Sequence, residues 1–105
     1  MTSKADQIDN IAHQTELIFP EAGNLAAPLR NLRWAALNYE LSKMGAALEE
    51  MVSILEPQVP LFLKGLLIQT AHRLKKGDIR GAELHVEEAR RYALSLDLEE
   101  TVFAA

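Results

Sequence analysis

The chain contains no cysteine, so its three histidines are the first candidates for chemistry. His13 precedes Glu16 by three residues and His85 precedes Glu88 by three, a spacing that places both side chains on one helix face. Asp9 shares the face of His13. Imidazole and carboxylate groups could together hold a transition metal. However, the Glu-x-x-His pairs typical of di-iron helical bundles are absent. We therefore predict no metal site and no cofactor, and we expect these residues at the polar edge of the core.

His72 is the third histidine, and cationic side chains surround it in the segment AHRLKK (71–76). On a helix, His72 shares a face with Gln69 and Lys76, away from the apolar stripe that ends at Leu74. We therefore expect an exposed imidazole beside Lys75 and Lys76. The simplest interpretation is a surface histidine on a solvated basic helix.

The segment AHRLK (71–75), followed by the step Gly81-Ala82, resembles the motif of the histidine-containing phosphotransfer domain. That family is a four-helix bundle of similar length with a solvent-facing, phospho-accepting histidine. The resemblance implies that His72 is the phospho-acceptor and Lys75 a phosphate-steering cation. Lys76 departs from the pattern, because the family strongly prefers a glycine there, where a small residue lets the phosphate donor approach.

The remaining pattern predicts an all-α, four-helix bundle-like single domain over residues 1–105. Ala, Leu, Glu, Lys and Arg dominate, and all of them favour helices. Capping residues and prolines bound four helices, at about 4–18, 28–56, 60–76 and 79–96. Ser3 is expected to cap the first helix, and Gly77 and Asp78 to close the third and open the fourth. The tail, 97–105, is expected to extend the last helix or to fray.

The second helix is predicted to be long. Its apolar residues repeat at alternating spacings of three and four, the a/d pattern of a coiled-coil seam. A helix over 28–56 would be roughly 43 Å long, enough to act as a bundle spine or as a surface shared with a second copy. Whether it bends near Gly45 is left open. The stripe, which is the predicted interaction face, comprises Trp34, Leu37, Leu41, Met44, Leu48, Met51 and Leu55.

Charge and hydropathy narrow the function classes. The formal net charge is −4, which disfavours general affinity for nucleic acid or an anionic membrane. The stretch 57–77 carries four cations and no acid, and we expect it to pack beside acidic neighbours. The first residues lack a signal-peptide core, and no apolar run reaches the roughly 20 residues that span a bilayer. We predict a cytoplasmic protein.

No complete catalytic constellation is present, because the serines lack a neighbouring base and the glycines form no phosphate-binding loop. In contrast, the second and fourth helices carry more apolar residues than a small bundle can easily bury. We therefore predict a non-enzymatic protein–protein interaction module, such as an accessory, adaptor or regulatory subunit, that forms a homodimer or joins a larger complex. The alternative is a phosphotransfer-like signalling protein that uses His72 and Lys75.

Overall fold

The computed structural model describes residues 3–19, 23–56 and 58–96, and this part of the chain is helical, without a strand. The described elements comprise α1 (Lys4–Ile18), a 3₁₀ turn η1 (Gly23–Leu25), α2 (Ala26–Leu37), α3 (Leu41–Leu55), α4 (Leu61–Lys75) and α5 (Ile79–Leu96). The prediction of an all-α fold is therefore confirmed. The expectation for the tail, 97–105, lies outside the described residues.

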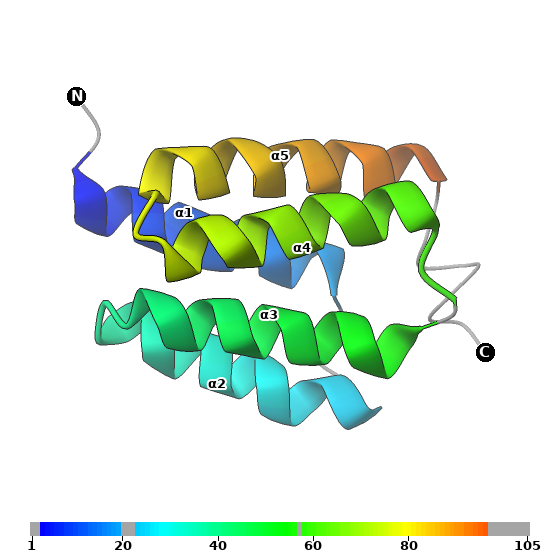
Figure 1. Cartoon of the computed structure of the whole chain (residues 1–105). Coiled ribbons are helices and arrows are strands. Elements are labelled where there is room, and N and C mark those ends of the chain that lie inside the picture. Colours follow the sequence, from blue (N-terminus) through cyan, green and yellow to red (C-terminus); the bar gives the residue numbers. More distant parts are fainter. Residues whose placement is uncertain (1–2, 20–22, 57, 97–105) are drawn as a thin grey trace.

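The five α-helices form a closed ring around one core (Figure 1). α2, α3, α4 and α5 follow one another as antiparallel neighbours, and α1 closes the ring by packing in parallel beside α5 and more loosely against α2. Each α-helix contributes at least one fully buried side chain to the core, among them Ile11, Leu32, Leu48, Leu67 and Val86. Burying each such side chain stabilises the fold by roughly 1.5–3 kcal/mol.

Three of the helices lie where their end signals place them. α1 begins after Ser3, whose hydroxyl accepts a hydrogen bond from the backbone N–H of Asp6 at 3.1 Å. α4 ends at Lys75, and Gly77, two residues later, has a φ of 80°. α5 follows Asp78, whose carboxylate accepts from the backbone N–H of Gly81 at 2.9 Å. These contacts satisfy backbone donors that a helix terminus leaves free.

The prediction of one long helix over 28–56 is wrong. The chain breaks after Leu37, and Tyr39 adopts the left-handed conformation with a φ of 56°. The N–H of Glu40 donates to the carbonyl of Ala35 at 2.8 Å, and the N–H of Tyr39 donates to that of Ala36 at 3.2 Å. These two bonds define a Schellman motif, the usual end of a helix. Its left-handed position usually holds glycine, so a tyrosine there gave no signal.

The break explains why the described residues form five α-helices where four were expected. α2 folds back antiparallel against α3 instead of continuing it (Figure 1). The same bond pattern ends α4, where the N–H of Asp78 donates to the carbonyl of Arg73 at 2.8 Å. In that second motif glycine occupies the left-handed position, at Gly77. The two turns therefore share one geometry. Only the turn at Gly77 could be predicted from the sequence, because glycine is the residue that usually marks it.

Three of the four cations in the stretch 57–77 pair with acids of neighbouring segments, in line with the expected acidic neighbours. Lys64 pairs with Glu56 and Lys75 pairs with Glu49 on α3. Arg73 contacts the carboxylate of Asp78 at 3.2 Å. Charges held in such pairs are not presented to a partner as an open cationic patch.

A buried polar contact joins α1 to α5. Glu83 is only 6% exposed, and it accepts a hydrogen bond from the side-chain amide of Asn10 at 2.8 Å. Arg80 donates to its other carboxylate oxygen at 3.1 Å. Asn10 in turn accepts from Gln14 at 3.1 Å. A buried carboxylate needs such donors, because leaving it without partners would cost free energy; the pair therefore fixes the register of the two helices.

None of the described helices combines the length and the hydropathy that crossing a lipid bilayer requires.

Candidate interaction site

The structure divides the predicted interaction face between the core and the surface. Met44, Leu48 and Met51 are fully buried within the chain itself. Leu41 and Leu55 are partly buried against the core, whereas Trp34 and Leu37 are 62% and 68% exposed. The stripe is therefore not one surface. Because the turn at Tyr39 reverses the chain, the part on α3 faces the other helices while the part on α2 faces outward.

Three large apolar side chains remain exposed near the end of α2, and each borders a different hollow. Trp34 lies beside α3, Leu37 lies beside α1, and Tyr39 is 61% exposed in the turn. The side-chain amide of Asn38 donates to the carbonyl of Trp34 at 2.8 Å and supports the turn. Tryptophan and tyrosine are enriched in protein–protein interfaces. An exposed tryptophan on a rigid helix is a strong candidate for an anchor residue.

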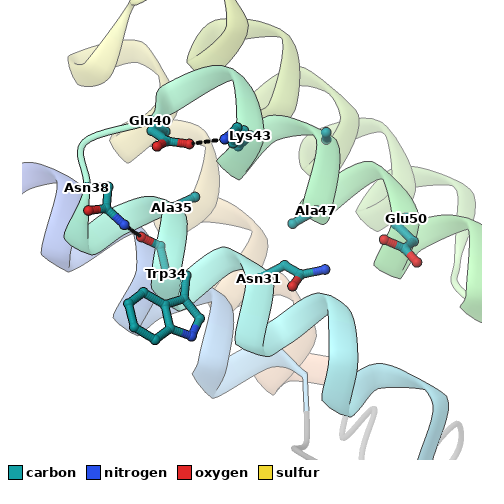
Figure 2. Close-up of a pocket in the computed structure, with 9 residues that line it drawn as sticks. Asn31, Trp34, Ala35, Asn38, Glu40, Lys43, Ala47 and Glu50 are labelled. Atoms are coloured by element: carbon teal, nitrogen blue, oxygen red, sulfur yellow. Dashed lines mark hydrogen bonds and ion pairs between the residues drawn. The ribbon is translucent and has the colours of Figure 1, made fainter.

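A groove between α2 and α3 runs beside Trp34 (Figure 2). Its volume is about 430 Å³. Small side chains form its floor, and Figure 2 shows Ala35 and Ala47 directed towards the space between the two helices. The full lining comprises Asn31, Trp34, Ala35, Asn38, Glu40, Lys43, Ala46, Ala47 and Glu50. Such a floor lets another helix approach closely, because no long side chain has to move.

Charged groups occupy the α3 side of the groove. Lys43 contacts the carboxylate of Glu40 at 2.6 Å, and the Lys43 side chain is 73% exposed. Within the described residues, Glu50 has no hydrogen-bond or ion-pair partner. The groove thus offers an aromatic wall, an alanine floor and one carboxylate free to pair. Trp34 belongs to the predicted interaction face, whereas the alanines and the charged residues of the groove do not. Their only signal in the sequence is the regular spacing of small and charged residues along α3.

His72 lies on the exposed side of α4, in its last turn, as predicted. Lys75, one turn along, is held by Glu49, and Lys76 is exposed at the end of the helix. Ala82 of the Gly81-Ala82 step is fully buried at the start of α5. The imidazole is accessible, but the lysine that the resemblance assigns to phosphate binding already has a carboxylate partner.

His13 and His85 lie in different surface hollows. His13 lines the space between α1 and α2 with Asp9 and Glu16, and Glu16 pairs with Arg33 at 2.5 Å. His85 lies between α4 and α5. Among the described residues, no group of three or more histidine, aspartate or glutamate side chains gathers where a metal ion could be held.

The ring of His85 is oriented by its own helix. Its Nδ1 atom lies 2.8 Å from the carbonyl oxygen of Gly81. A carbonyl oxygen can only accept a hydrogen bond, so Nδ1 carries the proton in this contact. Glu88 is exposed on the same helix. The hydrogen bond to Gly81 therefore explains the orientation of the His85 ring on the surface of α5.

Comparisons of this chain with protein-family models, with curated proteins and with solved structures find no match.

Proposed function

We propose that this protein is a non-catalytic protein–protein interaction module that binds its partner through the groove between α2 and α3. The observation that carries the proposal is Trp34, a large apolar side chain left 62% exposed at the edge of a groove with a small-residue floor. Covering a large apolar side chain is worth roughly 1.5–3 kcal/mol. Leu37 and Tyr39 are also exposed, but they border other hollows and do not enter the proposal.

The remaining features of the groove fit this role better than catalysis. Its polar groups are amides, one ammonium and two carboxylates, from Asn31, Asn38, Lys43, Glu40 and Glu50. The lining holds no serine, histidine or other group arranged as a nucleophile with a base. Polar side chains around an apolar centre are typical of the rim of a protein interface.

Trp34→Ala tests the proposal, with Leu61→Ala as the matched control. Leu61 is 83% exposed and lies at the start of α4, at the opposite end of the molecule from the α2–α3 turn. Association of the tagged protein, with itself or with a partner from a native lysate, should weaken for Trp34→Ala and persist for Leu61→Ala. Both variants should unfold at the temperature of the wild type, because neither side chain is in the core. Equal binding by all three proteins would contradict the proposal.

The second candidate function is histidine phosphotransfer at His72, which the exposure of this side chain favours. A phosphotransfer protein should take up acid-labile phosphate from a receiver domain and lose this capacity on His72→Ala. The interaction module should bind its partner equally well with that substitution. The two functions therefore separate in one pair of assays on the same variant.

A further inference from the structure

The outer side of α3 carries a short charge pattern with an internal symmetry. Lys43 and Glu50 lie one on each side of the pair Ala46 and Ala47, at equal distances along the helix. All four residues line the groove. Lys43, Ala46 and Glu50 are exposed, whereas Ala47 forms part of the floor at 5% exposure. Spacings of three and four place them along one stripe of the helix.

This pattern is complementary to itself when two copies of the helix lie antiparallel. The midpoint between Ala46 and Ala47 then coincides in both copies. Lys43 of one copy faces Glu50 of the other, and the symmetric contact repeats on the far side of the crossing point. Such reciprocal contacts are the signature of a two-fold interface, in which one patch binds its own copy. A parallel pairing would instead place Lys43 against Lys43 and Glu50 against Glu50.

We propose that α3 forms the interface of a symmetric homodimer, with the two copies of α3 antiparallel and crossing at Ala46 and Ala47. The inference rests on the proposed function and names its partner, a second copy of this chain. The alanines allow the helix axes to approach to the short end of the usual range of about 8–10 Å. Each Lys43 then pairs with the Glu50 of the second copy.

The ion pairs within the single chain leave these groups available. Glu50 has no partner among the described residues. In the same part of the chain, Lys43 pairs with Glu40 alone, one turn away on the surface, and exposed pairs of this kind contribute little. An ammonium can remain near Glu40 while it contacts a second carboxylate, since it has three donors. Trp34, on the α2 side of the groove, would be covered by the second copy.

Charge reversal tests the geometry, because the two single reversals should complement each other. In Lys43→Glu, two carboxylates face one another at both symmetric contacts. In Glu50→Lys, two ammonium groups do so. Each variant alone should dimerise at least about 10-fold more weakly than the wild type, measured by sedimentation velocity over a concentration series. An equimolar mixture of the two variants restores both attractive contacts and should form a heterodimer, which native mass spectrometry identifies by its mass.

The matched controls are Glu88→Lys and Arg91→Glu, which make the same charge changes at exposed positions on α5. These variants should dimerise as the wild type does. Dimerisation of the wild type should also weaken with added salt, because exposed charges are screened. The inference is overturned if the wild type stays monomeric, if the single reversals dimerise normally, or if their mixture forms no heterodimer. A monomeric wild type that still captures another protein in a Trp34-dependent manner would refute the homodimer but leave the proposed function standing.

Discussion

Gly45 provides a sharp test of how α3 packs against α4. It is buried in the middle of α3, and a Cβ atom built on it would lie 2.8 Å from the carbonyl oxygen of Ala71. The next contact is Lys75 Cγ at 3.0 Å. The flexible lysine can move aside, but the Ala71 carbonyl belongs to the backbone of α4. Gly45→Ala therefore requires the two helices to separate.

Two opposing effects set the magnitude. Alanine is a better helix former than glycine by about 0.8–1 kcal/mol. Overpacking a tight contact typically costs about 1–3 kcal/mol. We expect the contact to dominate, so that Gly45→Ala lowers the free energy of unfolding by about 1 kcal/mol. Gly65→Ala is the control, because Gly65 lies within α4 with open space around its Cβ position. That variant should gain about 1 kcal/mol, since only helix propensity changes.

Thermal unfolding measured by circular dichroism distinguishes the two variants. One kcal/mol shifts the midpoint by roughly 4–8 °C in a domain near this size, so the two variants should differ by about 10 °C. Both must be measured at one protein concentration, because self-association would change the apparent stability. A Gly45→Ala variant that unfolds at or above the midpoint of Gly65→Ala would refute the close packing of α3 on α4.

Two further predictions concern the turn after α2 and the contact between α1 and α5. Tyr39→Gly should stabilise the fold by about 1 kcal/mol, because glycine adopts the left-handed backbone without strain. Gly77→Ala in the matching turn should destabilise the fold by a similar amount. Urea denaturation measures both free energies of unfolding, and a change in the same direction for both variants would contradict the left-handed conformation at these two positions. Asn10→Leu should cost about 1–3 kcal/mol, because buried Glu83 loses a donor. Combining it with Glu83→Leu should recover most of that loss, and a double-mutant cycle that shows simple additivity would argue against this contact.

Much of the fold could be predicted from local signals. α1 covers the expected range of 4–18, and α5 covers 79–96. α4 differs from the expected 60–76 only by a residue at each end. Ser3, Gly77 and Asp78 perform the capping roles expected of their residue types. These predictions succeeded because hydrogen bonds between near neighbours decide where a helix begins and ends.

The candidate site was harder to predict, and the interaction face shows why. The stripe from Trp34 to Leu55 is continuous only if α2 and α3 form one rod. The turn at Tyr39 breaks that rod, so Met44 and Leu48 entered the core while Trp34 remained outside. Spacing along a helix shows which residues share a face. It does not show whether that face packs against the core of the same chain or faces solvent.

The sequence by itself determined the helical class, most helix ends and the alternation of apolar and polar faces, because propensity, capping and periodicity act over a few residues. The tertiary structure alone decided the break between α2 and α3. A tyrosine in the left-handed region costs about 1–2 kcal/mol locally, and the packing of α2 back onto α3 offsets that cost. The same packing brings Trp34 of α2 beside Lys43 and Glu50 of α3, a groove that exists only once the two helices meet.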